Sequence, residues 1–410
     1  MTGLALLVLA GLLASQAVLW VADVLNLRAL RREPPPGFED VYDPARYARS
    51  QDYVRAKTRF GFIVTGVGLL ALLAFWFAGG FGAVDRWARG RAWGPVATGV
   101  VFLGVLSALK SAVRLPFDVY ATFCLEARFG FNRTTVKTFV LDRLKGLLLV
   151  SVLGGPILAL LLWLFGRLGA TAWLLAWGAV TAFSLLLQFI APTIILPLFN
   201  KFTPLPAGEL REAVFALAKK LNYPLAHLFV IDGSRRSSKG NAFFTGFGKN
   251  KKIALFDTLI QKQTVPELIG VLAHEIGHHK EHHVWKGFAL GVAQTGGLFF
   301  LLSLALGWPA LFAAFRVDAP SVHAGLALFG VIFAPANLLL SLPLLAYSRR
   351  NEYAADRYAA RVLGTGRDLA TGLKKLSADS LANLTPHPFY VWLHHTHPPL
   401  VERLAALHKI

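Results

Sequence analysis

The chain has 410 residues, of which 55% are hydrophobic and only 16% are charged, and its mean hydropathy is +0.52. This composition excludes an ordinary soluble enzyme and predicts a polytopic membrane protein. The formal net charge of +19 does not indicate a nucleic-acid-binding protein, because the basic residues gather in particular connections between apolar blocks. We therefore expect the lipid bilayer, and no nucleic acid, among the partners.

Seven apolar blocks are long enough to cross a hydrocarbon core of about 30 Å as helices. They run approximately over Gly3–Ala22, Phe60–Phe81, Pro95–Val113, Leu147–Phe165, Ala170–Ile195, Val284–Leu306 and His323–Tyr347. The first block could instead be a cleaved signal peptide. It has no basic residues before its apolar stretch, so we expect a retained span.

The basic residues also predict how the spans are oriented. They crowd the first connection, from Arg28 to Arg59, and the third, from Lys110 to Lys145. Arg167 and Arg316 are nearly alone in the fourth and sixth connections. The positive-inside rule then places the N-terminus outside and the C-terminus in the cytoplasm. In a bacterium the membrane would be the inner membrane.

A small α+β segment is predicted between the fifth and sixth blocks. We expect a helix over Gly208–Leu221, strands over His227–Ile231, Asn241–Thr245 and Ile253–Phe256, and a basic, flexible stretch over Ser234–Lys239. The last two strands surround Gly246, Gly248 and Asn250, which suits a hairpin. Its edge strand could hold an extended peptide by backbone hydrogen bonds. A purely structural hairpin is an equal alternative.

The sequence VLAHEIGHHKEHH contains the motif H-E-x-x-H, formed by His274, Glu275 and His278. Thr264 and Glu267 form a capping box before it, which predicts that the motif lies on a helix. The two histidines are four residues apart, so they share a helix face and can aim ring nitrogens at one Zn²⁺. Glu275 then lies beside the metal, where a general base takes a proton from a metal-bound water.

A third protein ligand must come from elsewhere, because a catalytic zinc keeps three protein ligands and one open position. Glu352, in S-R-R-N-E-Y-A-A-D, is the best carboxylate available. Asp356 follows one turn later and could accept the other N–H of a ligating histidine. Without the nearby motif, Glu352 and Asp356 would be interpreted as surface residues of a solvated helix that form ion pairs with neighbouring arginines. Beside H-E-x-x-H we favour the metal site.

The histidines that follow the motif are weaker candidates. The metzincin pattern places a Gly and a third His where this chain has Glu281 and Val284, so that pattern fails. We expect polar residues of a solvated helix end at His279, His282 and His283. Cys124 is the only cysteine, which excludes an intrachain disulfide and a thiolate metal site.

The C-terminal tail holds His397 in H-T-H-P-P-L. A hydrogen-bond donor opposite the metal would stabilise the oxyanion of a hydrolytic transition state. A single histidine before proline is more often a capping or packing residue, and spacing alone favours that alternative.

Several longer stretches resemble the type I CAAX prenyl proteases, which are integral-membrane zinc metalloendopeptidases. They are L-P-F-D-V-Y-A-T-F and E-A-R-F-G-F-N-R-T-T between Leu115 and Thr135, I-L-P-L-F-N-K-F-T-P-L from Ile195, N-A-F-F-T-G from Asn241, F-D-T-L-I from Phe256, H-E-I-G-H-H, S-R-R-N-E-Y-A-A-D and H-T-H-P-P-L-V-E-R. The resemblance implies seven helices around a water-filled chamber with the active site at its cytoplasmic end. It also implies Glu352 as third zinc ligand, and contacts of Asn241 and His397 with the substrate backbone or transition state.

Together these patterns predict a mainly α membrane protein with a small cytoplasmic α+β zinc-peptidase domain. We divide it into residues 1–198 with five spans, 199–283 with the H-E-x-x-H helix, 284–347 with two spans, and 348–410 completing the site. We expect one Zn²⁺ per chain, a peptide or protein substrate that is lipidated or not, and a monomer.

Three alternatives remain. The first is a quality-control zinc protease of the same clan, which would have fewer spans. The second is a site-two protease, which would place the motif inside a span, whereas here charged residues flank it. The third, of another class, is a transporter or channel with a regulatory metal site, with which the polar intramembrane residues Gln188, Gln294 and Asn337 are compatible.

Overall fold

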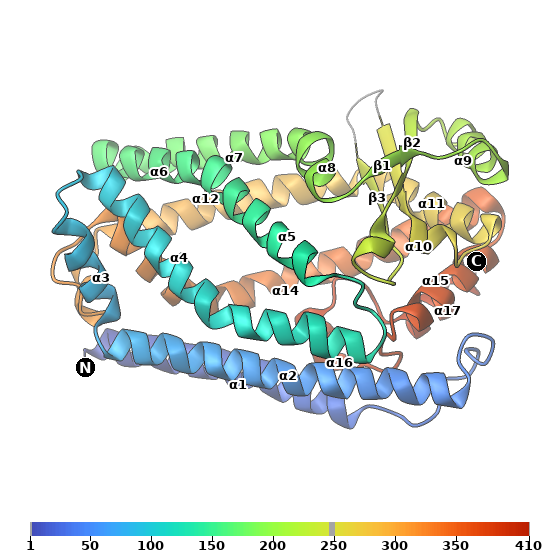
Figure 1. Cartoon of the computed structure of the whole chain (residues 1–410), viewed down its shortest axis with the longest axis horizontal. Helices are drawn as coiled ribbons and strands as arrows, with labels where there is room; N and C mark the ends of the chain where they lie inside the picture. The colour runs from blue at the N-terminus through green and yellow to red at the C-terminus, as the bar shows by residue number, and fades with distance from the viewer. Residues whose placement is uncertain (1, 246–250, 410) are drawn as a thin grey trace.

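A computed structural model describes residues 2–245 and 251–409. The chain is mainly helical, with one small sheet at one end of an elongated molecule (Figure 1). The helices are α1 (Gly3–Arg28), α2 (Pro44–Phe77), α3 (Gly80–Arg89), α4 (Pro95–Tyr120), α5 (Val136–Leu149), α6 (Gly155–Leu168), α7 (Ala172–Ile190), α8 (Leu196–Phe199), α9 (Glu209–Lys220), α10 (Asp257–Ile260), α11 (Val265–Lys280), α12 (His283–Leu306), α13 (Pro309–Ala314), α14 (Val322–Leu363), α15 (Arg367–Asp379), α16 (Pro388–His394) and α17 (Leu400–Leu407).

Seven helical stretches within the described residues are long and apolar enough to cross a membrane, which confirms the predicted number. They are Gly3–Arg28, Pro44–Phe77, Pro95–Glu126, Val136–Leu168, Ala172–Phe199, His283–Leu306 and Val322–Leu363. Most run well past the predicted blocks, because hydropathy detects only the apolar part of a helix. The predicted end of the second block, Phe81, was wrong, because α2 ends at Phe77. Gly79 adopts a left-handed conformation with φ 73° and separates α2 from α3.

The spans cover one another only sparsely. In the most apolar window of each span, only 0–22% of the residues are buried by other parts of the chain. Figure 1 shows α1 and α2 along one side of the molecule and α6, α7 and α12 along the opposite side, with α14 between them. Most of the apolar surface of these windows is therefore not covered by other described parts of the chain.

The sheet has four strands in the order β1-β2-β4-β3, formed by β1 (Phe202–Pro204), β2 (Leu225–Ile231), β3 (Ala242–Thr245) and β4 (Lys251–Phe256). β2 and β4 are parallel, and β3 pairs antiparallel with β4. The three predicted strands are confirmed with shifts of one or two residues, whereas β1 was not predicted. β3 is an edge strand. The predicted turn residues Gly246, Gly248 and Asn250 lie outside the described residues.

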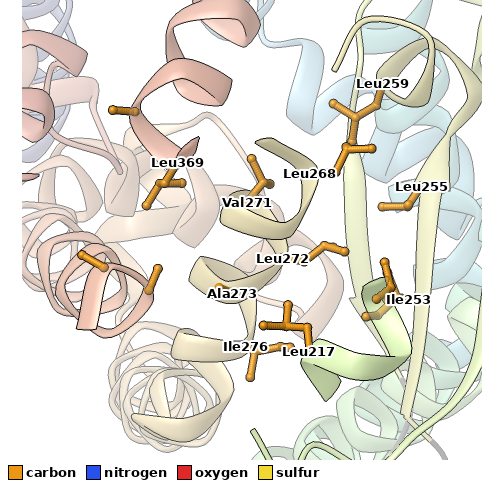
Figure 2. Close-up of a cluster of buried hydrophobic side chains, with 14 of the residues drawn as sticks. Leu217, Ile253, Leu255, Leu259, Leu268, Val271, Leu272, Ala273, Ile276 and Leu369 are labelled. Atoms are coloured by element: carbon orange, nitrogen blue, oxygen red, sulfur yellow. The ribbon is translucent and has the colours of Figure 1, made fainter. Parts of the chain in front are cut away.

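Helix α11, which carries H-E-x-x-H, packs in the hydrophobic core at the end of the molecule that contains the sheet. Leu268, Leu272 and Ile276 belong to a buried cluster that includes Ile253 of β4 and Leu369 of α15 (Figure 2). Because α11 is covered by both the sheet and α15, its rotation about its own axis is fixed. The two motif histidines are therefore presented on a defined face.

The stretch Ser234–Lys239 was predicted to be flexible, and that prediction was wrong. Arg236 donates hydrogen bonds from Nε and Nη2 to the carboxylate of Asp142 on α5, at 2.8 and 2.9 Å. Lys239 Nζ donates to Glu126 Oε2, after α4, at 2.9 Å. Two of the basic side chains that indicated a solvated loop, Arg236 and Lys239, thus have acidic partners on the spans. Through these ion pairs, the segment Ser234–Lys239 joins the sheet to the membrane helices.

Candidate metal centre

Helix α11 begins as the sequence predicted. Thr264 is its N-cap, the capping box with Glu267 is formed, and the Thr264 N–H donates to Glu267 Oε2 at 2.8 Å. Glu267 also pairs with Lys375 Nζ on α15, at 2.7 Å from Oε1. The start of the helix is thus fixed both locally and by tertiary contact. The positions of the motif residues, two to three turns later, follow from it.

Gly277 of H-E-I-G-H lets α11 approach α14 closely. A Cβ at this position would lie 3.2 Å from the carbonyl oxygen of Ala355 and 3.1 Å from the ring of Tyr358. A larger residue would push the two helices apart. Because α14 carries Glu352 one turn before this contact, the glycine brings the carboxylate within reach of the histidines.

The three residues predicted as metal ligands come together. The Nε2 atoms of His274 and His278 are 3.2 Å apart, and Glu352 Oε1 is 3.2 Å from His278 Nε2. One ligand atom from each residue lies within 4.8 Å of the others, a group that could hold a metal ion. His274 and Glu352 are buried and His278 is half-buried.

The donor set fits a metal ion better than it fits hydrogen bonding alone. Glu352 Oε2 is buried and has no hydrogen-bond partner among the residues that the structure describes, although Arg403 Nη1 lies 3.4 Å away and His274 Nε2 lies 3.5 Å away. A buried carboxylate oxygen without a donor is costly. Two imidazoles and a carboxylate around one point are also the ligands that zinc uses.

Asp356 lies where the sequence predicted, behind His274. Its Oδ1 is 2.8 Å from His274 Nδ1, so the carboxylate can accept the N–H on the nitrogen that faces away from the other ligands. Burial alone would lower the pKa of His274, but the Asp356 and Glu352 carboxylates outweigh it and raise the pKa to about 9. A proton therefore competes with a metal ion for this ring.

The sequence analysis missed Arg403 of α17. It is buried, donates to Asp356 from Nε at 2.8 Å and from Nη2 at 2.6 Å, and places Nη1 3.4 Å from Glu352 Oε2. This guanidinium neutralises part of the negative charge of two buried carboxylates. Its only sequence signal was its place at the end of H-T-H-P-P-L-V-E-R.

The prediction that His283 belongs to a solvated helix end was wrong. His283 is buried, and its Nδ1 lies 3.0 Å from His278 Nδ1. His282 is exposed, as expected, while His279 is half-buried with its ring edge-on to Tyr223. The chain turns at His282, whose φ of 57° is left-handed, and this turn carries the next residue back toward the site.

A cavity of about 970 Å³ opens beside the ligand group. Glu275, His278 and Glu352 line it, and Glu275 is half-buried there. Its other walls come from α12, α14, the α7–α8 region and strand β3, and they include the apolar residues Pro192, Leu196, Phe243, Val284, Trp285, Leu290 and Leu344. The potential general base therefore shares one open space with the ligand group.

Edge strand β3 borders this cavity through Ala242, Phe243, Phe244 and Thr245. Asn241, the predicted substrate contact, precedes the strand and is exposed. Its Oδ1 accepts the Ala242 N–H at 2.9 Å. The structure thus brings the strand to the cavity, while the role of the Asn241 side chain stays a prediction.

His397 also reaches the ligand group. Its Nε2 lies 3.4 Å from Glu352 Oε1, and 61% of its side chain is exposed. Thr396 Oγ1 lies 2.8 Å from His397 Nδ1, so a hydroxyl that donates to Nδ1 leaves the ring proton on Nε2, toward the site. Although much of its side chain is exposed, partial desolvation by the surrounding protein, together with the positive charge of Arg403, lowers the pKa of His397 against the opposing effect of Glu352, and this favours the neutral ring. Its position suits a donor, and its catalytic role stays a prediction.

Two family models together match nearly the whole chain. The one described as CAAX prenyl protease N-terminal, five membrane helices, matches residues 23–201, and Peptidase family M48 matches residues 204–410.

Individual relatives agree with the family models. The chain is 37% identical to a CAAX prenyl protease 1 homolog of Arabidopsis thaliana, over 94% of this chain and 93% of that protein, and 33% identical to the Homo sapiens homolog, over 91% and 88%. The crystal structure of S. mikatae Ste24p matches with a TM-score of 0.93 at 32% identity, over 99% of both chains. The chain therefore belongs to the CAAX prenyl protease 1 family of M48 peptidases and is an integral-membrane metalloendopeptidase.

Proposed function

We propose that this protein is a zinc metalloendopeptidase that cleaves C-terminal CAAX-type peptides carrying a prenyl group. One observation carries the proposal. His274, His278 and Glu352 converge at a cavity that Glu275 also lines. Two imidazoles and a carboxylate would hold one Zn²⁺ and leave a position open for water or substrate.

When bound, zinc would polarise the scissile carbonyl and lower the pKa of a coordinated water. Glu275 would take the proton from that water and return it to the leaving amine. His397 would donate its Nε2–H to the oxyanion. Asp356 would hold His274 in the tautomer that leaves Nε2 free to bind metal.

The prenylated substrate is proposed for two reasons. The similar proteins are named CAAX prenyl proteases. In this chain, the cavity beside the ligand group has apolar walls that include Trp285, Leu290 and Leu344. An isoprenoid attached near the scissile bond would bury its apolar surface against such walls. Strand β3 would hold the peptide as an added strand.

We further propose that the active site faces the cytoplasm and that the N-terminus lies outside, from the distribution of basic residues in the connections. The site combines residues of the 199–283 and 348–410 segments, which both follow odd-numbered spans and so share one side. One chain supplies every residue of the proposed site, so we propose that a monomer is active.

Purified protein, incubated with a farnesylated CAAX peptide and its unprenylated counterpart, tests the proposal. We expect cleavage of the farnesylated peptide that a chelator abolishes and zinc restores, and a loss of at least about 100-fold in Glu275→Gln. Glu281→Gln, at an exposed position after the same helix, is the matched control and should retain activity.

Other outcomes would overturn separate parts of the proposal. Cleavage that survives the chelator and Glu275→Gln would exclude zinc catalysis. Metal-dependent cleavage of both peptides at equal rates would exclude the prenyl group as a determinant and favour the quality-control protease. Absence of cleavage, with metal-dependent transport of a solute, would favour the transporter.

A further inference from the structure

His278 meets a second histidine behind the ligand group. Its Nε2 points toward His274 and Glu352, so Nδ1 is the nitrogen on the opposite side of the ring. That Nδ1 lies 3.0 Å from Nδ1 of His283, and the two rings pack edge to face, with centroids 5.1 Å apart at 68°. Two nitrogens at this distance share one hydrogen bond.

This contact depends on the break between α11 and α12. In a continuous α-helix, residues five apart point about 140° away from each other around the axis, so these rings could not meet. Here α11 ends at Lys280 and α12 starts at His283, and the left-handed His282 between them redirects the chain. Non-glycine residues adopt this conformation at some cost. His282 carries this backbone strain, at the turn that places His283 against His278.

The chemistry of a ligating imidazole requires an acceptor at this place. A histidine that binds metal through Nε2 carries its proton on Nδ1, and that N–H needs a partner which fixes the tautomer and the ring orientation. For His274 the partner is the Asp356 carboxylate, 2.8 Å away. Around His278 Nδ1, the partner found in the described part of the chain is His283.

We propose that His283 is a positioning residue, a neutral imidazole whose Nδ1 accepts the Nδ1–H of His278 and thereby holds this ring in the orientation for binding metal. The inference rests on the proposed metal site. His283 keeps its own proton on Nε2. The two ligating histidines are then supported differently, His274 by an anion and His278 by an uncharged ring. With a neutral ring as the acceptor, His278 is supported without adding a third buried carboxylate to a site that already holds Glu352 and Asp356.

Zinc affinity of the full-length protein in detergent, measured by competition with a chelator of known affinity, tests this role. His283→Asn is the informative conservative variant, since Asn Oδ1 occupies the position of His Nδ1 and can accept the same bond. We expect zinc binding within about 3-fold of wild type. His283→Leu retains much of the volume without an acceptor and should bind zinc about 10- to 100-fold more weakly.

Two further variants separate the possible failures. His282→Asn, which suits the left-handed conformation, should leave zinc affinity unchanged. His274→Ala should reduce it severely, and unchanged affinity in that variant would overturn the metal site itself. If His283→Leu binds zinc like wild type, or if Asn and Leu weaken binding equally, the positioning role is wrong. Should His283→Leu fail to fold, His283→Phe serves for the same comparison.

Discussion

Arg403 and Asp356 form a two-pronged ion pair at the back of the candidate metal centre, with Nε 2.8 Å from Oδ2 and Nη2 2.6 Å from Oδ1. Both side chains are buried, and the same Asp356 Oδ1 lies 2.8 Å from His274 Nδ1. The ion pair thus connects α17, at the C-terminal end of the chain, to the H-E-x-x-H helix through α14.

Substitution of Arg403 by Lys should destabilise the protein. Lysine keeps the charge but loses the planar fork that contacts both carboxylate oxygens. Loss of one partner of a buried pair costs about 3–5 kcal/mol, and retention of the charge should reduce this to about 2 kcal/mol. Thermal unfolding of the purified protein measures the change. Arg361→Lys, at an exposed position of α14, is the control and should stay within about 0.5 kcal/mol of wild type.

Substitution of His397 by Ala should reduce kcat without weakening zinc binding. Its side chain is 61% exposed and contributes no metal ligand in the proposed site, whereas a lost oxyanion donor costs about 100-fold or more in kcat. Steady-state kinetics and zinc content of the same preparation check this. His408→Ala, in the exposed tail, is the control. Normal kcat in His397→Ala would assign this residue to packing.

Substitution of Ala242 by Pro should weaken substrate binding and leave the sheet intact. The Asn241 carbonyl accepts the Phe256 N–H at 3.0 Å, so alternation along the antiparallel pair turns the Ala242 N–H away from β4. There it donates to Asn241 Oδ1 at 2.9 Å, and a substrate strand would take the place of this side-chain oxygen as acceptor. Proline is tolerated at such edge positions. Loss of one hydrogen bond of about 1 kcal/mol predicts a KM about 5-fold higher.

Ala242→Gly keeps the N–H and is the matched control for this experiment. If the Pro and Gly variants have the same KM, β3 does not pair with the substrate through this group.

Substitution of Glu267 by Gln should destabilise the protein in a pH-dependent way. Burial alone raises the pKa of Glu267, but Lys375 and the Thr264 N–H outweigh it and hold the pKa below its usual value of 4.5. The stabilisation from the ionised group is therefore complete above that value and is lost as the pH falls through the lower, folded-state pKa.

Loss of the charged cap should cost about 1 kcal/mol at pH 7. Unfolding temperatures of wild type and Glu267→Gln should thus differ at pH 7 and converge as the pH falls below 4.5 and through the lower, folded-state pKa of Glu267. A difference that is constant across this range would show that the ionised carboxylate contributes nothing.

The predictable parts of the molecule were those set by local pattern. Thr264, Glu267 and the apolar stripe that follows specify helix α11 from within a few turns of sequence, and the spans follow from hydropathy. Glu352 could be proposed because H-E-x-x-H requires a third ligand. Asp356 followed from it by helical spacing.

The unpredicted parts depend on contacts between distant segments. Arg403 lies 129 positions after His274 and meets it only through the packing of α14 and α17. His283 could not be placed because its position depends on one left-handed residue, His282. Strand β1 has three residues including Pro204, too few for a pattern, and forms because β2 offers it a partner.

Helix α14 connects the candidate metal centre directly to a membrane span. It is 42 residues long, and Glu352 lies about 45 Å from its start at Val322. A tilt of about 2° around that start would move the carboxylate by roughly 1.5 Å, and a misplacement of about 1 Å can cost 100-fold in rate. Spanning helices tilt to match the thickness of the membrane. The close contact between Gly277 of α11 and Ala355 of α14 lies only three residues from Glu352. It holds the two helices together there and so limits how far a tilt of α14 in the membrane can move the carboxylate away from the histidines.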